Sequence, residues 1–165
     1  MKPLRRLLAL AVGATMAADA AFALSCMKPD AVRLYTQARD SSDLYAIVIG
    51  QLQPDTKIAI PEPSTDGSGT RDLAATTRSR MFGRVLGENG FAQFFDREVD
   101  VQITCLSIWC GGPILGKDFL AALRVTGGVP ILEIGPCGGL TMEVDTDGID
   151  RLLTCHRTGE CVTEW

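Results

Sequence analysis

The stretch CLSIWCGG, from Cys105 to Gly112, carries the most chemically suggestive residues of this chain. A cysteine that follows a tryptophan and precedes a glycine is typical of a redox-active thiol, whose thiolate is resolved by a second cysteine three residues later. Here that position is Pro113, and two glycines stand where a helix should begin beside the nucleophile. The sequence therefore predicts that Cys110 is a structural, oxidised cysteine.

Two other groups have metal-ligating side chains, and neither has suitable spacing. Cys155, His156 and Cys161 lack the paired ligands at short, regular intervals that structural zinc sites use. Residues 143–148 begin like a calcium-binding loop, but Thr154 stands at the twelfth position, where such a loop needs a glutamate. We expect no metal and no cofactor, and we expect these acidic residues to lead into a helix.

The first residues predict an exported protein. Met1–Arg6 is basic and Leu7–Ala18 is uncharged and apolar, but too short for a membrane-spanning helix, which takes about 20 apolar residues. This pattern is typical of a secretory signal peptide, here residues 1–23, with cleavage before Leu24 or, alternatively, after residue 25 and directly before Cys26. A lipid anchor on Cys26 is a further alternative. Residues 24–165 are expected to form a single domain.

The cysteine count agrees with export. All six cysteines lie beyond the expected leader, and an even number in an exported chain predicts three disulfides. The formal net charge is −4, and removal of the basic leader makes the chain more acidic. We therefore expect a secreted or periplasmic protein that binds no nucleic acid and has no transmembrane segment after the leader. The cysteines are Cys26, Cys105, Cys110, Cys137, Cys155 and Cys161.

The chain between the cysteines is predicted to be mainly β. Alternation of polar and apolar residues is clearest in Glu98–Trp109, where Val99, Val101, Ile103 and Cys105 share one face. Further strands are expected at 43–53, 57–60, 81–87, 91–95 and 129–134, with Asn89-Gly90 as a tight hairpin turn. Residues 117–125 are ambiguous between strand and helix, and 61–79 are expected to be a loop.

A short final helix beginning at Asp147 or Asp150 completes the expected elements. Five or six short strands with regular turns and one late helix predict a small β-barrel.

The order of features resembles a known family, the netrin-like module of the tissue inhibitors of metalloproteinases. The resemblance rests on Cys26-Met27-Lys28-Pro29 before the first strand, then Cys110-Gly111, then Gly116-Lys117-x-x-Leu120, then an apolar strand that ends in Cys137, and finally a helix with terminal cysteines. It implies a five-stranded OB-type barrel with a C-terminal helix, fastened by disulfides. The expected fold class is therefore mainly β, with this barrel.

The resemblance also implies roles for two residues. Cys26, at the N-terminus of the mature chain, would chelate the zinc of a target protease through its amine and carbonyl, and Met27 would enter the specificity pocket. Cys110 or Cys137 would be the disulfide partner of Cys26, and a local Cys155–Cys161 disulfide is a further expectation. The family begins with Cys-x-Cys, whereas this chain has one cysteine there, and cleavage before Leu24 would block the chelating amine.

We therefore predict an exported, disulfide-bonded OB-fold protein that acts by binding and not by catalysis. Its expected partner is an extracellular or periplasmic zinc protease, inhibited through Cys26 and Met27. The chain has no nucleophile elbow, P-loop or HExxH motif and a single histidine, so an enzyme is not expected. The alternatives are a structural envelope protein and a domain that binds an oligosaccharide or small molecule, with Phe91, Phe94 and Phe95 as stacking groups.

Overall fold

Five strands of this chain close a hydrogen-bonded ring, flanked by two helices. The computed structural model describes residues 25–53, 55–62 and 74–164. Within them, chain order gives α1 (Ala31–Arg39), β1 (Leu44–Leu52), β2 (Ala74–Gly87), β3 (Gly90–Leu106), β4 (Trp109–Cys110), β5 (Phe119–Val125), β6 (Ile131–Ile134), β7 (Thr141–Glu143) and α2 (Thr146–Thr158).

The ring follows the order β1-β2-β3-β6-β5 and returns to β1. Its neighbours are antiparallel except β3 and β6, which run parallel. The contact between β5 and β6 is short, with Arg124 opposite Ile131. Outside the ring, β4 pairs with the end of β3 and β7 pairs with β5.

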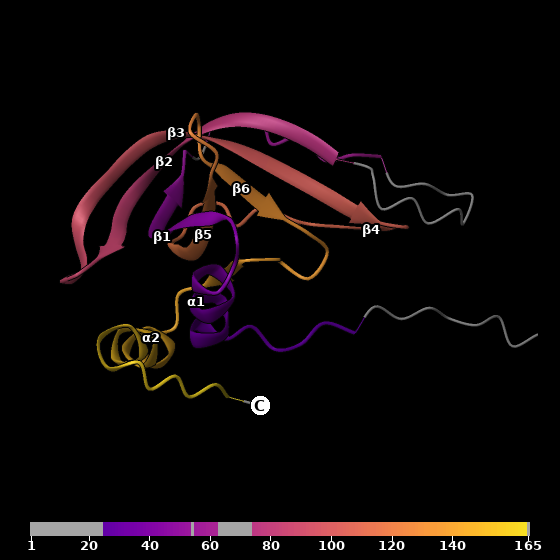
Figure 1. Ribbon diagram of the computed structural model, residues 1–165. Helices are drawn as coiled ribbons and strands as arrows, with labels where there is room; N and C mark the ends of the chain where they lie inside the picture. The colour runs from indigo at the N-terminus through magenta and orange to yellow at the C-terminus, as the bar shows by residue number, and fades with distance from the viewer. Residues whose placement is uncertain (1–24, 54, 63–73, 165) are drawn as a thin grey trace, which may run out of the picture.

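Two apolar clusters hold these elements together. The inner cluster fills the ring, because alternate residues of each strand point inward. The outer cluster joins the outer face of β1 and β5 to α1 and α2, and Figure 1 shows both helices on that side, with β2 and β3 arching over the other. The inner cluster consists of Val48, Leu52, Met81, Phe95, Val99, Val101, Ile103, Phe119, Ala121, Leu123, Leu132 and Ile134.

The hairpin is the best-predicted part of the fold. Gly87 pairs with Gly90 across the two turn residues Glu88 and Asn89, and Gly90 has a positive φ of 75°. Val99, Val101, Ile103 and Cys105 are buried as the alternation predicted. The two runs expected at 91–95 and 98–109 are one continuous strand, β3, followed by the short β4.

Other expectations need correction. Residues 57–60 form no strand, because the Ala59 amide donates to the hydroxyl of Thr77 and not to a strand backbone. Residues 74–79 of the expected loop belong to β2, and residues 63–73 of that loop lie outside the described residues. The ambiguous segment 117–125 is strand β5. The final helix starts at Thr146, and Asp145 caps it, earlier than expected.

Two elements, α1 and β7, were not predicted from the sequence. Helix α1 was not expected, although Asp30 after Pro29 is a good N-cap and the buried Ala31, Leu34 and Ala38 have helical spacing. The short β7 has only three residues.

Candidate functional site

The segment Ser25–Pro29 runs along the surface in an extended, exposed conformation. It is fastened near its start by a disulfide from Cys26 to Cys137, with a Cα–Cα distance of 5.4 Å. The sequence left Cys110 and Cys137 open as partners of Cys26, and the structure pairs it with Cys137. Of the two candidate cleavage sites, the one before Leu24 lies outside the described part of the chain, and the one directly before Cys26 follows Ser25, the first described residue.

Cys137 lies in a turn that presents it to this segment. It follows β6, and the next two residues, Gly138 and Gly139, both have positive φ, at 81° and 66°. A Cβ on Gly139 would lie 3.1 Å from the Glu133 carbonyl oxygen, so glycine suits this position sterically as well. The turn therefore holds Cys137 at the surface, where Cys26 reaches it.

Met27 is the large apolar side chain of the segment, with 72% of its surface exposed. It borders a shallow hollow between α1 and β7, together with Pro29, Leu34, Cys137 and Met142. The disulfide at Cys26 and the start of α1 at Asp30 fix the segment at both ends. Met27 thus projects from a short stretch of chain whose ends cannot move far.

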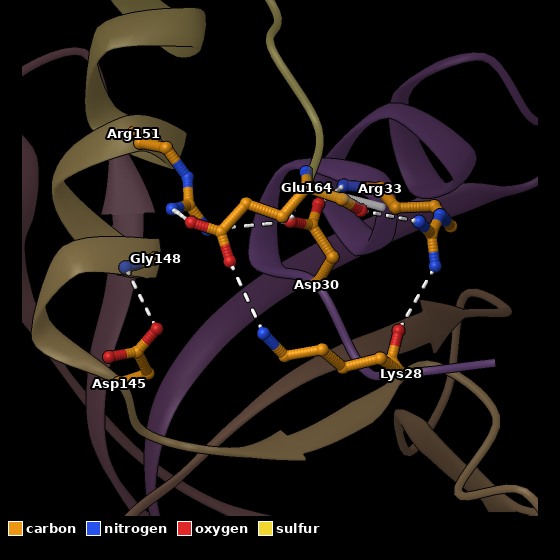
Figure 2. A network of polar contacts seen from close by, with 7 residues as sticks. All are labelled: Lys28, Asp30, Arg33, Asp145, Gly148, Arg151 and Glu164. Atoms are coloured by element: carbon orange, nitrogen blue, oxygen red, sulfur yellow. Dashed lines mark hydrogen bonds and ion pairs between the residues drawn. The ribbon is translucent and has the colours of Figure 1, made fainter.

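Asp30 fixes the second end. Its side chain, 3% exposed, accepts a hydrogen bond from the Arg33 amide at 2.7 Å and so caps α1. The other carboxylate oxygen accepts from the Glu164 amide at 3.1 Å and faces the Arg151 guanidinium at 3.4 Å. Asp30 therefore joins α1, α2 and the segment after α2, as Figure 2 shows.

Arg33 links this cluster to the exposed segment. One terminal nitrogen donates to the Lys28 carbonyl and the other to the Glu164 carbonyl, both at 3.1 Å. The Glu164 carboxylate forms ion pairs with Arg151 and with Lys28. Through Arg33, the Lys28 carbonyl of the N-terminal segment is thus linked to Glu164, which lies more than a hundred positions later in the chain (Figure 2).

The remaining cysteines are structural, as predicted for Cys110. Cys105 and Cys110 form a disulfide across the β3–β4 pair, and Cys155 and Cys161 form the expected local one. Within the residues that the structure describes, no cysteine is free.

His156 also has a structural position. Its Nε2 lies 3.1 Å from the Gly87 carbonyl oxygen, which only accepts, so Nε2 must carry the hydrogen. Its Nδ1 lies 3.1 Å from the Tyr35 hydroxyl and accepts from it in the neutral ring. His156 therefore ties α2 to α1 and to the turn end of the β2–β3 hairpin.

A second surface feature is an aromatic groove on the β2–β3 hairpin. It is bordered by Phe82 and Phe94, which are 42% and 83% exposed, and its floor includes Ile49 and Gly83. Phe94 carries the Arg84 guanidinium 4.6 Å from its ring centre. All three expected stacking residues line this groove: Phe94 is exposed, whereas Phe95 is mostly buried in the inner cluster and Phe91 packs partly against the outer one.

Carboxylates lie at the edge of this groove. Asp96 forms a two-point contact with Arg80, at 2.6 and 2.9 Å, and these hydrogen bonds lower the pKa of Asp96 below its ordinary value. Asp118, from the loop before β5, lies at the surface of the groove. Phe82 and Asp118 were not predicted from the sequence, because the surface that they share depends on the pairing of β1, β2 and β3.

Within the described ranges, no helix is long and apolar enough to cross a bilayer, and no group of three metal-ligating side chains lies together. Comparisons with protein-family models, with curated proteins and with solved structures gave no match, so the function must be argued from the chain's own residues.

Proposed function

We propose that this chain is an exported, disulfide-bonded protein that acts by binding and has the topology of an OB-type barrel. The ring order supports this topology. Counted along the chain, the third and fifth strands of the ring, β3 and β6, run parallel, and the fourth, β5, pairs with β1. Three disulfides support an oxidising compartment, secreted or periplasmic, as does the basic and apolar leader.

We further propose that the N-terminal segment inhibits a zinc metalloproteinase. The observation that carries this proposal is the disulfide between Cys26 and Cys137, which holds an exposed segment that includes Met27. If the mature chain begins at Cys26, its neutral amine and its carbonyl form a chelate that displaces the zinc-bound water. A segment that is already fixed loses little conformational entropy on binding, which favours affinity.

The first test is the mass of the exported protein. A mature chain that begins at Cys26 is required for chelation by the amine. A chain that begins at Leu24 and shows no inhibition would contradict the proposal, because two residues then precede the chelating group.

The second test uses purified protein with Cys26 as its first residue and a panel of secreted zinc endopeptidases. We expect inhibition that one additional alanine ahead of Cys26 abolishes, since the extension removes the amine without touching the fold. Met27→Ala should change the ranking of proteases, and Val162→Ala, at another apolar residue that is 70% exposed, is the matched control. Equal inhibition with and without the added alanine would exclude the chelate.

A second candidate function is favoured by the aromatic groove. Exposed aromatic faces with carboxylates beside them suit a neutral sugar ring, whose C–H face stacks on an aromatic ring while its hydroxyls donate to carboxylates. We propose that Phe82, Phe94 and Asp118 bind such a ligand. Calorimetric titration with neutral oligosaccharides should give heat that Phe94→Ala removes. Trp109→Ala changes an aromatic residue that is 46% exposed outside the groove and should leave the titration unchanged.

A further inference from the structure

The segment that follows α2 lies against the exposed N-terminal segment, although the two are far apart in sequence. Glu164 is the point of contact. Its amide donates to Asp30, its carbonyl accepts from Arg33, and its carboxylate pairs with Arg151 and Lys28. One residue therefore contacts both Lys28 in the N-terminal segment and the start of α1, and Figure 2 shows it at the centre of these groups.

Arg33 transmits this arrangement to the N-terminal segment. In the described part of the chain, the Lys28 carbonyl is the one backbone group of residues 27–29 that accepts a hydrogen bond, and its donor is Arg33. The other terminal nitrogen of Arg33 is held by the Glu164 carbonyl. A guanidinium is a planar fork, so fixing one of its nitrogens orients the other. The position of Glu164 thus governs the hydrogen bond to Lys28.

Two further contacts keep Glu164 in place. Cys161 is bonded to Cys155 of α2, which anchors the chain three residues before Glu164. Arg151, also on α2, has a buried Nε without a hydrogen-bond partner, so its terminal nitrogens depend on the carboxylates of Glu164 and Asp30. Arg151 therefore favours a fixed arrangement of both carboxylates, since the loss of either ion pair would leave a partly buried charge without its partner.

We propose that Glu164 is a positioning residue: through Arg33 and Lys28 it sets the direction in which Cys26 and Met27 leave the fold. The effect of Glu164 on inhibition rests on the proposed function, whereas its effect on the Cys26–Cys137 disulfide does not. Glu164 is then a part of the inhibitory site that makes no contact with the protease's metal. It acts by keeping the Cys26 thiol opposite Cys137 and Met27 outward.

The first experiment measures the disulfides themselves. In glutathione buffers, the equilibrium between reduced and oxidised Cys26–Cys137 reports the effective concentration of one thiol at the other. Glu164→Ala should lower this effective concentration about fivefold, the effect of losing partly exposed ion pairs. The Cys105–Cys110 disulfide, measured in the same sample by mass spectrometry of alkylated peptides, should not change, because it is remote from Glu164.

The variants separate positioning from general stability. Glu164→Gln keeps an acceptor for Arg151 and should retain most of the wild-type effective concentration. Arg33→Met removes both guanidinium contacts and should reproduce or exceed Glu164→Ala. The matched controls are Glu160→Ala, which removes the same charge from the same segment, and Arg157→Met on α2. If Glu164→Ala and Glu160→Ala give equal effective concentrations for Cys26–Cys137, the proposal is wrong. If the Cys105–Cys110 equilibrium changes in parallel, the effect is one of general stability and the positioning role is again excluded.

The second experiment measures inhibition with the same variants. Glu164→Ala should weaken inhibition about fivefold, and Glu164→Gln should recover it. If wild-type protein inhibits no zinc protease, the proposed function fails while the disulfide equilibrium still decides the role of Glu164. If wild-type protein inhibits and Glu164→Ala does so equally well, the positioning role fails while the inhibitory function stands.

Discussion

Gly50 of β1 lies directly opposite Gly83 of β2, and the two backbones approach more closely than any side chain would allow. A Cβ on Gly83 would come 2.5 Å from the Gly50 Cα, and one on Gly50 would come 2.9 Å from the Gly83 Cα. Gly83 also lines the aromatic groove, beside Ile49 of β1.

Gly83→Ala should therefore destabilise the protein by about 1–3 kcal/mol, the usual cost of forcing extra volume into a packed region. The measurement is the free energy of unfolding in urea. Gly112→Ala is the matched control, because a Cβ there meets no atom within 4 Å, and we expect its effect to stay within about 0.5 kcal/mol. Equal stability of the two variants would mean that β1 and β2 can separate freely.

The two helices offer a comparison of N-caps. Asp145 caps α2 through one hydrogen bond to the Gly148 amide, and Asp145→Ala should cost about 1 kcal/mol. Asp30 caps α1 and also accepts from Arg151 and the Glu164 amide, so Asp30→Ala should cost about 2–3 kcal/mol. Thermal unfolding of both variants compares the two losses. A smaller loss for Asp30→Ala would contradict the role of the buried carboxylate.

The disulfides should differ in what they contribute to stability. In the chain-entropy account, the stabilisation by a cross-link grows with the logarithm of the length of the loop that it closes in the unfolded chain. The sequence separations are 111 residues for Cys26–Cys137 and 5 for Cys105–Cys110. Replacing the first pair with serine should cost about 4–5 kcal/mol and the second about 2 kcal/mol. Urea denaturation without reductant measures both, and equal losses would argue against loop length as the cause.

The Arg80–Asp96 pair predicts a pH dependence. Hydrogen bonds from Arg80 lower the pKa of Asp96, so the pair stabilises the fold above the ordinary pKa of an aspartate, and this contribution is lost as the pH falls through the lowered value. In Arg80→Ala, the pKa of Asp96 should rise towards its ordinary value. Carboxyl carbon NMR titration measures this change. Arg78→Ala, whose partners are Asp100 and Glu98, should leave Asp96 as it was.

Local patterns were enough to predict much of the sheet. The alternation through Val99 and Val101 and the Asn89-Gly90 turn fix the β2–β3 hairpin, because side-chain direction along a strand depends on position alone. The parallel contact between β3 and β6 could not be predicted in this way, since it joins Asp100 with Ile131 and depends on how the chain returns. The same holds for helix α1, which owes its stability to packing on β1 and α2.

The candidate site was only partly predictable. The roles of Cys26 and Met27 come from the resemblance to the netrin-like module and stay predictions, and the choice of Cys137 over Cys110 as the partner of Cys26 depends on where β6 ends relative to α1. The cluster around Asp30 was not foreseen, because Arg33 and Glu164 are separated by 131 residues and carry no joint motif. Charged residues at such distances become partners only through the packing of the helices that hold them.

The Cys26–Cys137 disulfide encloses strands β1 to β6 in one covalent loop. A protease that cuts the backbone once anywhere between these two cysteines converts the loop into a linear chain but releases no fragment while the disulfide is intact. The connection between β1 and β2, the longest in the fold, falls inside this span. A protein nicked there would still carry Cys26 and Met27 attached to the turn at Cys137, and only reduction would separate the two pieces.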